Sequence, residues 1–185
     1  MARHGVGSNQ YKTRRGGASP PFGGEPPAVA SMRAWRILNS NRRYSSRRLA
    51  RMARDPEWQV RLVAASAPNC PPGTLAHLAM EEDRLALVIS KNPGAPWQVL
   101  QYLAVNPDKD VRLEVAKHPN TPPDTLAQLA ADEDGVVRWG VAKNPRTPSE
   151  VLAQLEGDKD EHVLGAALEN PNLPEEYRVL GRVAQ

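Results

Sequence analysis

Apolar residues recur along the chain in pairs of short clusters with helical spacing. Val111, Val115 and Ala116 fall on one helix face, and Leu126, Leu129 and Ala130 fall on another. A loop with two prolines separates the two clusters. The pattern predicts a unit of two short helices joined by a proline loop.

This unit repeats at a step of 25 or 26 residues. The first proline of each loop lies at position 68, 93, 119, 145 or 171, and the second lies three residues later. Two leucines follow each loop in four copies: Leu75 and Leu78, Leu100 and Leu103, Leu126 and Leu129, and Leu152 and Leu155. In the last copy we expect Tyr177 and Leu180 to take these two positions. Helices this short are marginal alone, so neighbouring units must bury their apolar faces, which predicts a solenoid.

The residues around each helix pair supply start and stop signals. The Asn-Pro or His-Pro step ends the first helix because the residue before proline avoids the α region. The second proline suits the first turn of the next helix. Acids at the start of the first helix are expected to cap free backbone N–H groups. The expected caps are Asp108 and Asp110, Asp134, Asp160, and Asp55 or Glu57.

The repeat register also extends toward the N-terminus. Leu49 and Met52 match the two leucine positions, while Arg42 and Ser45 replace the prolines. We therefore divide the chain into three parts. These are a disordered, basic, Gly/Pro-rich arm (1–30), a degenerate basic capping repeat (31–54) and the solenoid proper (55–185).

The repeated pattern V-R-x-x-V-A-x-N-P-x-x-P-x-x-x-L-x-x-L-A-x-D-x-D resembles the leucine-rich-repeat variant proteins of bacteria, over roughly residues 34–180. The resemblance implies an all-α, right-handed solenoid in which α-helices and 3₁₀-helices alternate. A HEAT-like array is the alternative, although its units usually run to about 40–47 residues. Some members carry an iron–sulfur cluster in a cysteine-rich N-terminal segment. The single Cys70 cannot supply the ligands for one, so no cofactor is expected.

Charge is divided unevenly along the chain. Residues 1–54 hold 12 basic groups and one acid, a net +11, and residues 55–185 hold 12 basic groups and 20 acids, a net −8. The capping repeat contains a cluster of arginines that are candidates for binding an anion or nucleic acid: Arg36, Arg42, Arg43, Arg47, Arg48, Arg51 and Arg54. Such a surface attracts phosphate backbones without base contacts. The alternative is a solvated or partner-binding cap.

Two further sets of basic residues recur at fixed repeat positions. Equivalent positions stack into ladders along a solenoid, so each set is a candidate ligand-facing ridge. The alternative is a structural or solvating role, with neighbouring acids neutralising the charge. The ladder candidates are Arg61, Arg112 and Arg138 in one set, and Lys91, Lys117 and Lys143 in the other.

Other reactive groups give little support for catalysis or metal binding. The D-x-D pairs, such as Asp108–Asp110, precede helix starts and lack a calcium-loop glycine pattern. The histidines have no zinc-like spacing, and His118 stands where other copies have asparagine, which indicates a turn role. Cys70 lies between prolines with no base nearby in sequence. Trp97 follows a second proline and is a candidate exposed aromatic.

We therefore expect a non-enzymatic binding scaffold that holds a protein partner on a repeat-built surface. Nucleic-acid binding through the basic cap and arm is the alternative, and a DNA-repair enzyme built on helical repeats is a weaker third. The absence of an apolar signal segment and of an unbroken membrane-length apolar run favours a soluble, cytoplasmic protein. No metal and no membrane partner are expected.

Overall fold

Pairs of short α-helices make up residues 44–175, the part of the chain that this computed structural model describes. The first helices of the pairs are α3 (Trp58–Ser66), α5 (Ala86–Ser90) with the 3₁₀ helix η1 (Asp83–Leu85) before it, α7 (Lys109–Lys117), α9 (Gly135–Lys143) and α11 (Glu161–Glu169). The second helices are α4 (Pro72–Glu81), α6 (Trp97–Leu103), α8 (Pro123–Leu129) and α10 (Ser149–Leu155), and α2 (Ser46–Met52) precedes the first pair. Residues 44–175 contain no strand, so the predicted all-α helix-pair fold is confirmed for them.

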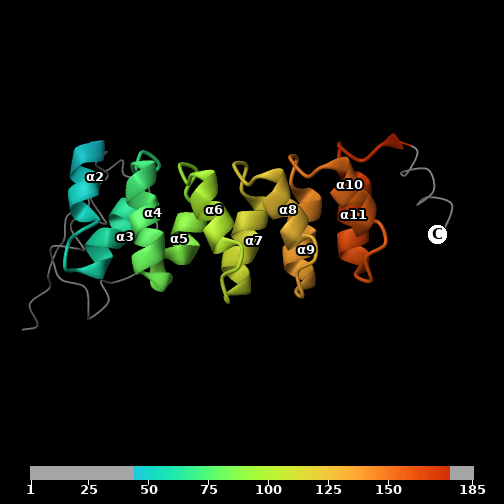
Figure 1. Cartoon of the computed structure of the whole chain (residues 1–185), viewed down its shortest axis with the longest axis horizontal. Helices are drawn as coiled ribbons and strands as arrows, with labels where there is room; N and C mark the ends of the chain where they lie inside the picture. Colours follow the sequence, from blue (N-terminus) through green and yellow to red (C-terminus); the bar gives the residue numbers. More distant parts are fainter. Residues whose placement is uncertain (1–43, 176–185) are drawn as a thin grey trace, which may run out of the picture. The chain divides into compact units, whose positions relative to one another are not determined.

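The helices of this part follow one another in chain order, pair after pair (Figure 1). The first helices of successive pairs pack on one another, α5 on α7, α7 on α9 and α9 on α11, and α4 packs on α6. Both leucine positions after the proline loop are almost fully buried in all four copies. The repeated leucines therefore form the continuous core that the repeat pattern predicts. No helix within 44–175 is long and apolar enough to cross a bilayer.

Helix α2 occupies the place of a second helix ahead of the first pair. Leu49 and Met52 are buried, as their match to the leucine positions requires, and α2 packs on α3. Tyr44 opens the compact unit that contains all the described helices. The predicted arm, residues 31–43 of the capping repeat and the Tyr177 and Leu180 substitutions lie outside the described residues.

The expected alternation of α- and 3₁₀-helices is wrong for residues 44–175. The second helices α4, α6, α8 and α10 are α-helices that follow directly on the second proline of each loop. In α8, the Leu126 N–H donates to the Pro122 carbonyl (3.0 Å) and the Ala130 N–H to the Leu126 carbonyl (2.9 Å). This i→i−4 pattern closes because a proline at the cap leaves its carbonyl free to accept the first helical bond.

The 3₁₀ helix η1 coincides with the one 25-residue step of the repeat. Leu85 comes seven positions after Leu78, whereas Val111 comes eight positions after Leu103 and Val137 eight positions after Leu129. With one residue fewer, the first turn tightens to 3₁₀, and α5 retains five α-helical residues where α7 has nine. The loose match of this copy in the sequence thus corresponds to a shortened helix.

Candidate binding surfaces

The residue before the first proline of each loop carries a buried hydrogen-bond ladder. The Asn144 side-chain amide donates to the carbonyls of Ala116 (2.6 Å) and His118 (3.2 Å) in the preceding repeat. Asn92 and Asn170 make the corresponding pairs of bonds. Their Oδ1 atoms accept the N–H two residues later, which closes the loop. These asparagines therefore serve the loop as well as ending the first helix.

His118 replaces asparagine in this ladder, and its turn role is confirmed. Its Nδ1 accepts the Asn120 N–H (3.0 Å), so the proton lies on Nε2, which donates to the Asn92 carbonyl (2.9 Å). The ring is buried and makes one bond to the preceding repeat, whereas the asparagines make two.

The arginine ladder candidates are held by the protein's own carboxylates. Arg138 makes a bidentate pair with Asp158 through Nε (2.7 Å) and Nη2 (2.9 Å), and its Nη1 bonds the carbonyls of Asp132 (2.8 Å) and Glu133 (3.2 Å). Arg112 makes the same four bonds one repeat earlier, with Asp132 as its carboxylate partner. The geometry fits the structural alternative rather than a ligand-facing ridge.

These pairs shift the pKa values of both partners. The hydrogen bond from Arg138 lowers the pKa of Asp158 below its usual range, and the same bond raises the pKa of Arg138. The bond to Asp132 likewise raises the pKa of Arg112. Both guanidinium groups therefore favour the charged, paired state.

Arg61 pairs less completely. One guanidinium nitrogen meets Glu82 and another reaches the backbone carbonyls of Asp55 and Pro56, but Arg61 Nε and Glu82 Oε2 are buried without a hydrogen-bond partner. Glu82 lies 21 residues after Arg61, whereas the carboxylate partners of Arg112 and Arg138 lie 20 residues later, and this pair belongs to the 25-residue step of the repeat. In the following repeat Ala86 takes the arginine position.

The lysine ladder candidates Lys91, Lys117 and Lys143 are exposed. Lys117 pairs with Glu114 of the same helix (3.3 Å), and Lys143 pairs with Glu169 of the next repeat (2.5 Å). That bond lowers the pKa of Glu169. Exposed pairs of this kind contribute little stability, so this surface stays available to a ligand.

The predicted aspartate caps are confirmed at three helices. Asp108, Asp134 and Asp160 accept the N–H two residues later at the starts of α7, α9 and α11, each at 2.9 Å. At α3, Glu57 is the cap residue but makes no side-chain cap bond, and Asp55 accepts the Glu57 N–H instead. The D-x-D pairs are thus cap and first-turn positions.

Four of the candidate anion-binding arginines lie within the described residues. Arg47, Arg48, Arg51 and Arg54 are exposed on and just after α2, and the guanidinium of Arg48 lies over the Tyr44 ring at 4.8 Å. Within residues 44–175 none of the four forms an ion pair. Arg36, Arg42 and Arg43 lie outside the described residues.

Cys70 is buried, and burial raises the pKa of its thiol to about 11. Its repeat position is filled by the buried residues Ala95, Thr121, Thr147 and Leu173 in other copies. A thiol in this environment is a core side chain and a poor nucleophile.

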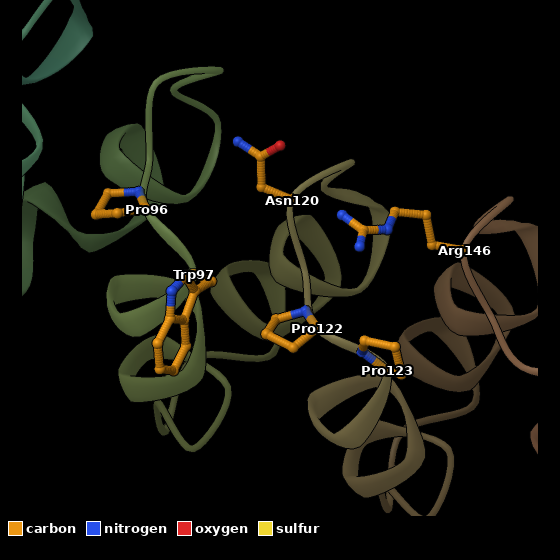
Figure 2. A pocket seen from close by; sticks show the side chains of 6 residues that line it. All are labelled: Pro96, Trp97, Asn120, Pro122, Pro123 and Arg146. Atoms are coloured by element: carbon orange, nitrogen blue, oxygen red, sulfur yellow. The ribbon is translucent and has the colours of Figure 1, made fainter.

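An open groove of about 430 Å³ lies along three successive proline loops. Pro96 and Trp97 come from the first of these loops, Asn120, Pro122 and Pro123 from the second, and Arg146 from the third. Figure 2 shows Trp97 and Pro122 on either side of the gap, and Arg146 extending from its loop toward Asn120. Trp97 is exposed, as its position after a second proline suggests, whereas the groove was not predicted from the sequence.

A signal for the groove is nevertheless present in the sequence. Trp97 stands where the other copies have Pro72, Pro123, Ser149 and Glu175, and Arg146 stands where they have asparagine or glycine. Both residues therefore differ from those that occupy the same repeat position in the other copies.

Comparison with known proteins supports the family resemblance. Residues 110–134, which span α7, its proline loop and α8, match the family model described as "Leucine rich repeat variant". A solved structure described as a leucine-rich repeat variant with a novel repetitive protein structural motif is 22% identical, with 75% of this chain and 71% of that chain covered and a TM-score of 0.35. A search of curated proteins found no match. The family model therefore confirms the predicted resemblance to the leucine-rich-repeat variant family, and residues 44–175 form a helical repeat array.

Proposed function

We propose that the protein is a non-enzymatic scaffold that binds a protein partner through the surface of α4 and α6. The observation that carries this proposal is the placement of exposed apolar side chains. Of the six large hydrophobic residues exposed within 44–175, four lie on these two helices or directly after them: Met80, Trp97, Tyr102 and Val105. Because α4 packs on α6, these side chains belong to neighbouring elements.

Burial of such side chains by a partner is the usual source of affinity at protein interfaces. Met80 and Val105 are 67% and 65% exposed and occupy the same repeat position in adjacent repeats. The repeated polar side chains, in contrast, are largely bonded within the solenoid. The apolar side chains are therefore the part of the surface that a partner would cover.

The proposal is tested by placing a charge in this surface. We compare the full chain with Tyr102→Arg and with the control Gln154→Arg, an exposed residue at the same repeat position two units later. Each protein is immobilised, and nuclease-treated lysate proteins that it retains are identified. We expect a partner retained by the wild type and by Gln154→Arg but lost with Tyr102→Arg. Equal retention by all three proteins would contradict the proposal.

The second candidate function is nucleic-acid binding by the basic cap. The observation that favours it is the exposure of Arg47, Arg48, Arg51 and Arg54 without an ion pair in the described part of the chain. Fluorescence anisotropy with labelled duplex and single-stranded DNA and RNA across a salt series tests it. Phosphate contacts predict an affinity that falls steeply with salt and is lost in Arg47→Ala/Arg51→Ala but kept in Arg84→Ala. Absence of binding at low salt would leave the protein-binding proposal alone.

A further inference from the structure

The groove formed by the three proline loops has walls that suit an extended peptide. Trp97 is 52% exposed, and its indole and the Pro122 ring lie on opposite sides of the gap (Figure 2). An aromatic ring beside proline rings provides flat apolar surfaces against which proline side chains of a ligand can pack. At about 430 Å³ the groove is open and holds a few residues, not a helix or a globular domain.

The free polar groups of the groove are mostly donors. Within the described residues the Nε1–H of Trp97 has no acceptor, and the Arg146 guanidinium uses one nitrogen to bond the Pro119 carbonyl (3.0 Å). The other guanidinium nitrogens of Arg146 point to no acceptor in this part of the chain. Asn120 uses its amide nitrogen on the carbonyls of Pro93 and Ala95. The groove can therefore donate several hydrogen bonds to a ligand.

A proline-rich peptide matches this arrangement of donors. Its prolines lack N–H groups and leave their carbonyls as unpaired acceptors, and its polyproline II form is largely fixed before binding. Little conformational entropy is then lost when it binds. An ordinary extended peptide would bring backbone donors for which the groove offers few acceptors.

The charge of the groove adds a second requirement for its ligand. Arg146 is the one charged residue that lines it, and no carboxylate within the described residues neutralises its guanidinium. A carboxylate side chain on the ligand can form a charge-assisted pair there. This combination is local, because Pro123 and Asn172 take the equivalent positions one repeat later.

We propose that this groove binds a proline-rich segment of a partner protein that carries a glutamate or aspartate next to its prolines. The prolines pack between Trp97 and Pro122, the indole N–H donates to a peptide carbonyl, and Arg146 binds the carboxylate. The inference rests on the proposed protein-binding function and names a site and a ligand chemistry for it.

The test uses the full chain and a fluorescein-labelled synthetic peptide in which one glutamate stands within a run of prolines. Binding is followed by fluorescence anisotropy. We expect saturable binding that Trp97→Ala weakens about tenfold or more, as truncation of an interface tryptophan does. Trp58→Ala, which truncates another partly exposed tryptophan, should leave the affinity unchanged.

A charge exchange separates the specific pair from general loss of structure. Arg146→Glu should abolish binding of the glutamate peptide, and a peptide with lysine in place of glutamate should bind this variant better than it binds the wild type. Far-ultraviolet circular dichroism confirms that each variant keeps its helices.

Two outcomes would overturn the inference. Failure of the peptide to bind the wild type would do so, and so would equal binding by Trp97→Ala, Arg146→Glu and the wild type. Neither outcome contradicts the proposed function, because the Tyr102→Arg experiment detects a protein partner of any chemistry. Loss of a partner with Tyr102→Arg alongside no peptide binding would place the interface on α4 and α6 outside the groove.

Discussion

The Arg138–Asp158 pair gives the sharpest test of what holds successive repeats together. We consider Arg138→Met, which removes the guanidinium and replaces the aliphatic part of the side chain with an unbranched apolar one. The change deletes two bonds to the Asp158 carboxylate and two to the carbonyls of Asp132 and Glu133. Both charged side chains are 8% exposed, so water replaces these bonds poorly. Asp158 keeps one bond, from the Asp160 N–H.

The magnitude follows from these contacts. Removal of one partner of a buried ion pair costs about 3–5 kcal/mol because the other charge is left without its counterion. We expect the low end, about 3 kcal/mol, because Asp158 lies in the loop between α10 and α11 and keeps its bond from the Asp160 N–H. For a chain of this size that loss lowers the Tm by roughly 6–12 °C.

Urea unfolding followed by circular dichroism measures the change in free energy. The control is Arg84→Met, whose guanidinium lies over the Trp58 ring at 5.6 Å on an exposed surface, and which should cost about 1 kcal/mol or less. A double-mutant cycle with Asp158→Asn isolates the pair, and we expect a coupling of about 2 kcal/mol. The m-value must stay constant, because a repeat protein can unfold in segments.

The reasoning would be refuted if Arg138→Met destabilised the protein no more than Arg84→Met. A coupling near zero would also refute it, since Arg138 would then act only through its two backbone carbonyl bonds. In either case the arginine ladder would be a consequence of repeat stacking and not one of its causes.

Three further predictions follow from other contacts. Arg138 lowers the pKa of Asp158 in the folded state. The stability that ionised Asp158 gives the fold is therefore complete above its unfolded-state pKa near 3.8, and it is lost as the pH falls through its folded-state pKa. The difference in unfolding free energy between wild type and Asp158→Asn should therefore shrink from pH 7 to pH 3, and a constant difference would contradict the assigned pairing. His118→Asn should keep or raise the Tm because asparagine can make both ladder bonds. His118→Ala should cost about 2 kcal/mol because it leaves the Asn92 carbonyl and the Asn120 N–H unpaired. Equal Tm values for the two variants would exclude the hydrogen-bonding role of His118. Gly140→Ala should destabilise the protein by about 1–3 kcal/mol because the added Cβ would lie 2.9 Å from Leu113 Cδ1. Gly165→Ala has open space around the added Cβ and should stabilise the protein by about 0.5–1 kcal/mol. Thermal unfolding should therefore show a lower Tm for the first variant and a higher Tm for the second.

The fold was predictable from the sequence because its determinants are local and repeated. The two leucines after each proline loop specify the buried face, and the cap residues Asp108, Asp134 and Asp160 specify where the first helices begin. Each signal acts within a few residues and recurs in several copies. The expected alternation of α- and 3₁₀-helices came from the family resemblance and not from these local signals, and it was wrong for the described residues.

The ladders were harder to predict because their partners are distant in sequence. Arg112 and Asp132 lie 20 residues apart, and Asn144 reaches a carbonyl 28 residues earlier. Whether a repeated arginine points to solvent or back onto the next loop depends on how one helix pair is rotated against the next. That rotation arises from packing between units, and the sequence pattern within a unit does not contain it.

Repeated and unrepeated positions therefore have different physical roles in this protein. Residues that recur at the same repeat position form hydrogen bonds between neighbouring units. Arg112 and Arg138 are one such set, and Asn92 and Asn144 are another. A group that is already bonded and buried adds little to the affinity for a ligand. A residue that differs from its equivalents in the other copies can carry groups beyond those that the stack uses. Arg146 bonds the preceding loop through one nitrogen, as Asn120 and Asn172 do, and its other guanidinium nitrogens are left over. Trp97 and Arg146 are departures of this kind, and both leave donors free at the surface of the proline loops. Recognition is therefore to be sought where the repeat is broken, and the stability of the scaffold where the repeat is kept.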